Sequence, residues 1–300
     1  MRLQKRIIGS SVTLVTAFAA FAIVALVVVI MGNIVLGGWE KITWGFLTGE
    51  PTHGMTEGGI FPAIFGTFLL VVIMSIVGVP VGTVTAIYLS EYASQKSVLA
   101  RLVRFAVNTL AGVPAIVFGL FGLGFFIQFV GGGIDKMFTG GGELKWGQPN
   151  ILWASLTMAL LTLPVVIVSV EEAIKTVPRE LREASLALGA TKWQTIRRVV
   201  IPNSFTGILT GGILAVSRGA GEVAPILFTG AAYFLPHLPS SLSDQFMELG
   251  YHVYIMATQS PDVEATKGIQ YATTLVLLVM TFALNFSAIF LRYRIRKRFV

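Results

Sequence analysis

The 300-residue chain has no cysteine and few charged side chains. Without cysteine it can form neither disulfide bonds nor zinc–thiolate sites, and thiol catalysis is excluded. Charged residues make up 12% of the sequence, whereas roughly a quarter is typical of soluble domains. The three histidines, His53, His237 and His252, are far apart and lack the spacing of metal ligands. We therefore expect no metal and no cofactor.

The sequence also lacks a nucleotide-binding loop. Its two glycine runs, Gly131–Gly133 and Gly140–Gly142, are followed by no Lys-Ser or Lys-Thr pair, so they are predicted to be loop glycines on the external side. Neither a Ser-His-Asp arrangement nor a pair of catalytic carboxylates can be argued. We predict that the chain is not an enzyme and that any ATP hydrolysis takes place on a partner chain.

Long apolar runs dominate what is present. Hydrophobic residues make up 54% of the chain, and the mean hydropathy is +0.78. A run of about 20 apolar residues crosses a bilayer as a helix, and helices are favoured because they satisfy their own backbone groups in lipid. The first run is too long for a signal peptide. The prediction is an all-α polytopic membrane protein with six transmembrane helices, at about 7–31, 62–90, 107–130, 150–170, 204–235 and 268–291.

The basic residues are divided unevenly between the two sets of loops. One set holds only Lys41, Lys136, Lys145 and Lys267, and Arg218 lies within an apolar run. All other lysines and arginines fall in the opposite set, which includes both termini and the loop at 171–202. Cytoplasmic loops carry such an excess. We therefore predict a cell-membrane protein with both termini in the cytoplasm, and the net charge of +7 needs no nucleic-acid partner.

The loop at 171–202 is predicted to form two short helices. Pro178 can occupy the start of the first helix, and Gly189 can end it. Leucines and Ala184 give this helix an apolar side, and Pro202 leads into the next span. From composition alone, an interfacial amphipathic helix that caps the bundle remains an alternative.

The order and spacing of residues in this loop resemble the E-A-A-x3-G-x9-I-x-L-P motif of ABC importer permeases. The matching residues are Glu183, Ala184, Ser185, Gly189, Val199, Ile201 and Pro202. Ser185 replaces the second alanine of the motif, Val199 its isoleucine, and Ile201 its leucine. The resemblance implies a type I ABC importer permease fold in which Glu183, Ala184, Gly189 and Pro202 belong to a helix–turn–helix that docks onto a separate ATPase.

The fifth apolar run contains two charges, Arg218 and Glu222. Four residues apart on a helix, they would share one face. A charge within a span is costly and indicates a functional site. Arg218 could attract an anion, since its planar fork suits tetrahedral oxyanions, while Glu222 holds it in place. Pro225 is predicted to kink this helix. A purely structural ion pair between helices remains the alternative.

Three further stretches resemble the permeases of the high-affinity phosphate ABC importer. They are SRGAGEVAPILFTG, GTVTAIYLSEYA and LAGVPAIVFGLFG, within roughly 60–290. Length and an early N-terminus favour the PstA-type subunit. The resemblance implies a substrate pathway through Arg218 and Glu222, and three kinds of partner: a PstC-like second permease, a PstB-like ATPase dimer and a PstS-like phosphate-binding protein.

The expected domain division is a first helix with its external loop at 1–61, a type-1 transmembrane core at 62–293 that contains the coupling segment, and a basic tail at 294–300. Import of another oxyanion, such as sulfate, molybdate or phosphonate, stays open as an alternative. An ion-coupled secondary transporter is a further alternative, although such proteins usually show an inverted repeat and we detect none.

Overall fold

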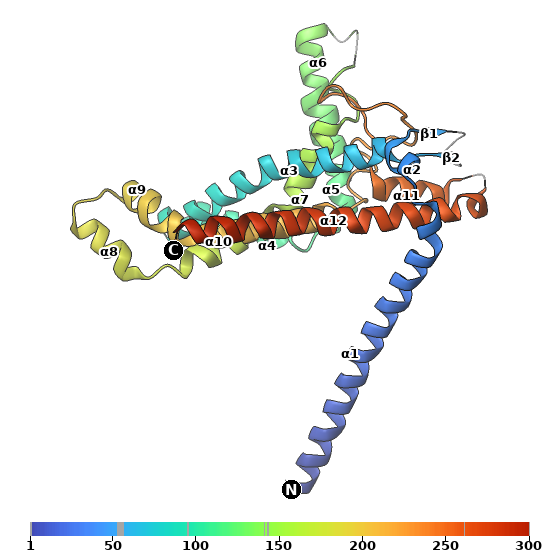
Figure 1. Ribbon diagram of the computed structural model, residues 1–300. Coiled ribbons are helices and arrows are strands. Elements are labelled where there is room, and N and C mark those ends of the chain that lie inside the picture. Colours follow the sequence, from blue (N-terminus) through green and yellow to red (C-terminus); the bar gives the residue numbers. More distant parts are fainter. Residues whose placement is uncertain are drawn as a thin grey trace.

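The computed structural model describes residues 2–52, 57–94, 96–140, 142, 144–260 and 262–299, and they form a predominantly helical protein (Figure 1). Of the three histidines, His53 lies outside the described residues. Six helical stretches within the described part of the chain are long and apolar enough to cross a membrane. The predicted number of spans is therefore confirmed.

The long helices are α1 (Arg2–Gly38), α3 (Phe61–Ile87), α7 (Ile151–Lys175), α10 (Ile201–Gly219) and α12 (Val263–Phe299). The remaining span is a continuous rod of α5 (Ala115–Phe121), the π-helix η4 (Gly122–Gly131) and α6 (Gly132–Thr139). Shorter helices are η1 (Trp39–Lys41), α2 (Trp44–Thr48), η3 (Tyr88–Tyr92), α4 (Val98–Leu110), α8 (Arg179–Ala187), α9 (Lys192–Thr195), η5 (Ile196–Val200) and α11 (Leu249–Thr258). Two short strands, β1 (Pro51–Thr52) and β2 (Glu57–Gly58), pair antiparallel.

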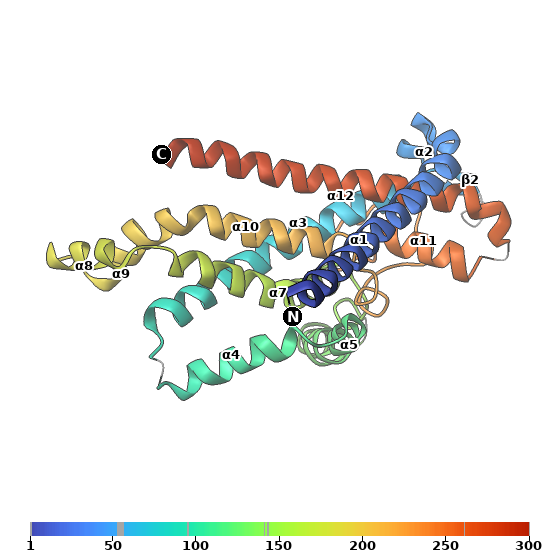
Figure 2. The same cartoon turned by 90° about the horizontal axis from the view of Figure 1, so that it is seen from below.

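The centre of the bundle is formed by α3, α7 and α10, which run side by side with α12 along α10 (Figures 1 and 2). Glycines allow the close approach. A Cβ placed on Gly82 of α3 would lie 2.6 Å from the Val166 side chain of α7, and one on Gly66 would lie 2.0 Å from the carbonyl oxygen of Met247. Apolar side chains of α3 and α7, such as Met74 and Met158, fill the interior. Dispersion and close packing therefore hold this core, as is typical of helices in lipid.

The first helix diverges from the bundle, and its N-terminal end lies far from the other helices (Figure 1). It meets α12 through Gly37 and Gly38, where a Cβ on Gly38 would lie 2.7 Å from the backbone nitrogen of Ala272. The apolar side chains that precede this contact, such as Leu14 and Phe21, are exposed in the single chain.

The third span begins later than predicted. Residues 107–110 belong to α4, a separate helix with the cations Arg101 and Arg104 on it, and the turn at 111–114 ends at Pro114, which caps α5. The prediction that Gly131–Gly133 lie in a loop is also wrong. Gly131 ends η4, and the next two glycines begin α6. Apolar neighbours and close packing of Gly131 against the carbonyl of Trp146 keep this stretch helical despite its glycines.

The fifth span is shorter than predicted. Instead of reaching residue 235, α10 ends at Gly219, and residues 220–248 are irregular. The backbone amides of Asn150 and Ile151 at the start of α7 donate to the carbonyls of Thr229 and Asp244. The irregular segment thereby satisfies the free N–H groups that every helix start carries. The part of the segment that follows the charged pair, including Pro225, Ile226 and Thr229, is buried, as expected for non-helical backbone at membrane depth, which needs protein around it.

Candidate translocation and coupling sites

The two charges of the fifth span lie where α10 stops. Arg218 is in the last turn of the helix, where its positive charge is favoured by the helix dipole. Its Nε lies 3.9 Å from Oε1 of Glu222, which belongs to the turn after the helix. The two side chains are 39% and 30% exposed. The ion pair is present as predicted, but the two residues do not share a helical face, because the helix ends between them.

The guanidinium of Arg218 is only loosely held. The ion pair with Glu222 is near the distance limit of such contacts, and no hydrogen bond to this guanidinium is found among the described residues. By contrast, Arg104 and Arg182 each bind a carboxylate at 3.0 Å or less and also donate to backbone carbonyls. The η nitrogens of Arg218 therefore remain available to a ligand.

This loosely held arginine lies at the depth of the bundle's middle. Its neighbour Gly219 is buried, and a Cβ there would lie 2.2 Å from Cε of Met74 in α3. Met74 is 13 residues into α3, which corresponds to about 20 Å at 1.5 Å per residue. The hydrocarbon core of a bilayer is about 30 Å thick. The end of α10 thus presents Arg218 and Glu222 well inside the span region.

The predicted kink at Pro225 is wrong, because Pro225 lies beyond the end of α10 in the irregular segment. Pro225 is buried, and its carbonyl accepts a hydrogen bond from Oγ1 of Thr229 at 3.0 Å. A Cβ on Gly119 of α5 would lie 2.8 Å from that same carbonyl oxygen. Pro225 therefore fixes the packing of the segment that follows the charged pair.

The segment at 171–202 folds largely as predicted into short helices. Pro178 is the N-cap of α8, and Gly189 follows its end with φ +83°, a conformation that suits glycine. Thr191 and Gln194 form a capping box that starts α9, a signal we did not extract from the sequence. The hydroxyl groups of Ser185 and Thr195 lie 2.9 Å apart and join the two helices. The turn is consequently rigid and well defined.

Pro202 lies inside a continuous helical rod, not at a break between two helices. It occupies the first turn of α10, directly after the five-residue π-turn η5. Proline lacks the N–H that an α-helical turn needs, and the wider turn before it accommodates that loss. The rod from Lys192 to Gly219 therefore connects the 171–202 segment directly to Arg218.

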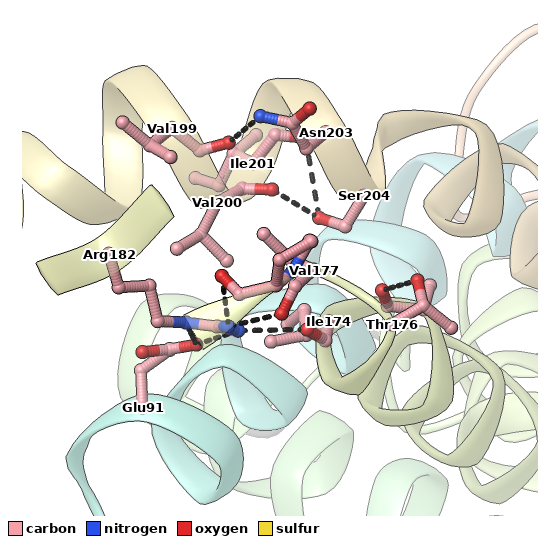
Figure 3. A network of polar contacts seen from close by, with 12 residues as sticks. Glu91, Ile174, Thr176, Val177, Arg182, Val199, Val200, Ile201, Asn203 and Ser204 are labelled. Atoms are coloured by element: carbon pink, nitrogen blue, oxygen red, sulfur yellow. Dashed lines mark hydrogen bonds and ion pairs between the residues drawn. The ribbon is translucent and has the colours of Figure 1, made fainter. Parts of the chain in front are cut away.

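One polar contact of α8 with the membrane helices is not evident from the sequence. Arg182 donates from Nη2 and Nε to Oε1 of Glu91 in η3, at 2.9 and 3.2 Å, and from Nη2 to the carbonyl of Ile174 at 2.9 Å. Its Nη1 donates to the carbonyl of Val177. Figure 3 shows Arg182 pointing at Glu91 and the end of α7. This cluster ties α8 to α7 and to η3, the turn that continues α3.

The opposite side of the segment is apolar and open. Leu188 is 89% exposed, and Leu181, Leu186 and Trp193 are also exposed. Glu183, Ala184 and Gly189 are exposed alongside them. With Arg182 facing the bundle, these side chains form a surface suited to a partner protein, because exposed apolar patches mark interaction sites.

Two further titratable residues are buried at the far end of the bundle. Glu248 caps α11 by accepting from the amide of Tyr251, and its Oε1 lies 3.5 Å from Oγ1 of Thr67. Burial raises the pKa of Glu248 to about 7 and lowers the pKa of His252 to about 4. Both residues lie between the predicted fifth and sixth spans, and nothing in the sequence indicates that they are buried.

Six membrane-crossing helices, a short helical segment with an open apolar side, and a charged pair inside the bundle define a polytopic membrane permease. Residues 78–300 match the family model described as the binding-protein-dependent transport system inner membrane component, and the chain belongs to this family.

Similar proteins are found over the whole chain. The probable ABC transporter permease protein YqgI of Bacillus subtilis (strain 168) is 30% identical over 310 residues, covering 99% of both chains. The phosphate transport system permease protein PstA 1 of Mycobacterium tuberculosis (strain ATCC 25618 / H37Rv) is 35% identical over 236 residues, covering 76% of this chain and 70% of that protein.

Among solved structures, a bacterial ABC transporter involved in the import of the acidic polysaccharide alginate superposes with a TM-score of 0.63. The match has 17% sequence identity and covers 98% of this chain and 99% of that chain. This likeness confirms the predicted fold of a type I ABC importer permease.

The chain is therefore the permease subunit of a binding-protein-dependent ABC importer, a multi-pass membrane protein whose ATPase is a separate chain. ATP hydrolysis belongs to the ATPase partner, as predicted.

Proposed function

We propose that this permease imports inorganic phosphate across the cytoplasmic membrane. The observation that carries the proposal is the loosely held guanidinium of Arg218 at the end of α10, at bilayer depth, beside Glu222. The similarity to a phosphate transport system permease supports the choice of anion. Phosphate presents tetrahedral oxygens that match the paired donors of a guanidinium.

Glu222 gives the site its reversibility. With a carboxylate 3.9 Å away, the positive charge of Arg218 is partly neutralised, so a bound anion is not held too tightly to leave. An oxyanion approaching Arg218 competes with Glu222 for the same donors. The bound anion and the carboxylate of Glu222 are both negative and repel each other, so release of the anion is favoured once the pathway opens to the other side.

We infer that the driving force enters through the 171–202 segment. The exposed surface around Glu183, Ala184, Gly189 and Leu188 docks onto a PstB-like ATPase dimer. Closure of that dimer displaces α8, and the Arg182 cluster transmits the displacement to α3 and α7. The helical rod that contains Pro202 carries it to Arg218. Access to the site then alternates by movement of rigid helices.

The complete importer in this proposal contains a PstC-like second permease and a PstS-like phosphate-binding protein besides the ATPase. Both termini face the cytoplasm, as the basic loops predict. Residues 1–61 form an outlying helix with an external loop, 62–293 form the transport core, and 294–300 form a basic tail.

The test is ATP-dependent uptake of labelled anions by the complete importer in proteoliposomes. Phosphate uptake is expected, with sulfate, molybdate and phosphonate as competitors. Arg218→Ala should lower uptake about a hundredfold, because two charge-assisted hydrogen bonds are lost. The Arg218→Lys variant should retain only a small part of the wild-type uptake, since lysine keeps the positive charge but lacks the paired donors of the guanidinium.

The matched control is Arg294→Ala, which removes an arginine whose guanidinium lies over the Phe290 ring near the end of α12. It should leave uptake unchanged. Transport of sulfate in preference to phosphate would show that phosphate is not the substrate. Normal uptake by the Arg218→Ala variant would show that Arg218 does not bind the anion and has only a structural role.

A further inference from the structure

A second cationic site lies at the other end of the bundle from the irregular segment, where η3, α4, α7 and α8 meet. A cavity of about 650 Å³ is found there, within the range of about 300–1,000 Å³ that is usual for ligand sites. Five cationic side chains line it: Arg101, Arg104, Lys175, Arg179 and Arg182. A smaller cavity of about 390 Å³ shares Lys175, Arg179 and Arg182 and reaches Glu183 of the docking surface.

Two of the five cations are already neutralised. Arg104 binds Glu171 at 3.0 Å, and Arg182 binds Glu91 at 2.9 Å. These two arginines form walls of the cavity and hold the elements together. In this region, each arginine that holds two elements together is thus paired with a carboxylate.

The other three cations have no such partner. Arg101 of α4, Lys175 of α7 and Arg179 of α8 form no ion pair with any described residue. Each comes from a different element, yet all three line one cavity. An excess of cytoplasmic lysine and arginine accounts for their presence on this side, but it does not require that they converge.

The wall of the cavity also contains an unsatisfied polar group. Ser90 of η3 lines both cavities, and its buried hydroxyl has no hydrogen-bond partner within the described part of the chain. Buried polar groups are normally satisfied. Three unpaired cations that line one cavity match a multiply charged oxyanion better than a carboxylate or a chloride ion.

We propose that this cavity binds a phosphate group, supplied either by free inorganic phosphate or by the headgroup of an anionic lipid. The amphipathic helix α4 makes a lipid source reachable, because its apolar side chains Leu102 and Phe105 are exposed next to the cavity's cations. A phosphate group here bridges α4, α7 and α8. Occupancy therefore stiffens the attachment of the 171–202 segment to the membrane helices. The site is separate from Arg218 and does not depend on the transported anion.

The experiment measures hydrogen exchange of the assembled transporter, with its ATPase bound, in nanodiscs. One arm adds inorganic phosphate to discs of phosphatidylcholine, and the other uses discs that contain phosphatidylglycerol without added phosphate. Peptides that cover 98–105 and 174–183 should exchange more slowly in at least one arm. Protection in the first arm identifies free phosphate, and protection only in the second identifies the lipid.

The test variant is the triple substitution Arg101→Gln, Lys175→Gln and Arg179→Gln. The charge-matched control replaces Arg197, Arg198 and Arg294 by glutamine. We expect the cavity variant to lose the protection and the control to keep it. The single variant Lys175→Gln should weaken binding about tenfold, because one charge-assisted contact is lost.

The Arg218→Ala variant should keep the protection, which separates this site from the proposed transport site. Protection that survives in the cavity variant would place the anion elsewhere and overturn the proposal. So would the absence of protection in both arms, which is the result expected if a side chain of the docked ATPase fills the cavity.

Discussion

Replacing Arg182 by methionine should loosen α8 without disturbing the membrane helices. The wild-type guanidinium binds Glu91 and donates to three backbone carbonyls, and the side chains of Arg182 and Glu91 are only 19% and 12% exposed. Methionine fills a similar volume but leaves Glu91 without a counter-charge. Breaking a buried pair costs about 3–5 kcal/mol, and the residual exposure here favours the lower end, about 3 kcal/mol.

A loss of about 3 kcal/mol corresponds to an increase of about a hundredfold in the population of the detached state, since 1.4 kcal/mol is a factor of ten. Amides of α8 should exchange with solvent faster by up to that factor, whereas those of α7 should not change. In proteoliposomes, the number of ATP molecules hydrolysed per anion transported should rise, because displacement of α8 no longer moves α3 and α7.

A double-mutant cycle with Glu91→Gln isolates the pair. In the Glu91→Gln background, Arg182→Met should cost much less than in the wild type, because the charge it leaves behind is already gone. Strictly additive effects, or unchanged exchange in α8, would refute the role assigned to this cluster.

Three other predictions follow from packing, burial and exposure. Gly66→Ala should lower the melting temperature in detergent, because the new Cβ would lie 2.0 Å from the carbonyl oxygen of Met247. The control Gly133→Ala, also in a helix, should not lower it, because no atom lies within 4 Å of the new Cβ. Between pH 4.5 and 7 the folded state keeps the Glu248 proton that the unfolded state has lost, so this residue makes stability fall as pH rises. Between pH 4 and 6.5 the unfolded state binds a proton at His252 that the folded state does not, so this residue makes stability rise with pH. The melting temperature should therefore be nearly independent of pH in the wild type. It should rise with pH in Glu248→Gln and fall with pH in His252→Gln. Leu188→Ser should leave the melting temperature unchanged, because Leu188 is 89% exposed. The same variant should weaken binding of the ATPase about tenfold or more in a pull-down titration. Unchanged binding would contradict the assignment of this surface as the docking surface.

The spans were predictable because hydropathy reports the environment of a side chain directly. The turn at Gly189 was also predictable, since a glycine after a short amphipathic helix has a local conformational reason to be there. The end of α10 was not. Residues 220–235 are as apolar as a span because many of them, such as Ala220, Ile226 and Ala232, are buried against the bundle, and hydropathy does not distinguish buried irregular backbone from a helix.

The sequence alone does not reveal contacts between residues that are far apart along the chain. Arg182 and Glu91 are 91 positions apart, and each was counted only as a loop or motif charge. The environment of Glu248 depends on Thr67 of α3, and nothing adjacent in the sequence indicates it. Arg218 and Glu222 were recognisable because charged residues within an apolar run are rare.

The dependence of α7 on the irregular segment constrains how the nascent protein enters the membrane. The first amides of α7 find their acceptors near residues 229 and 244, roughly 80 to 95 positions later in the chain. Until that stretch has been synthesised, only water or lipid headgroups can satisfy them. The N-terminal end of α7 is therefore expected to stay near the membrane surface during translation, and to reach its final position only after residues 229–244, which follow α10, have been synthesised.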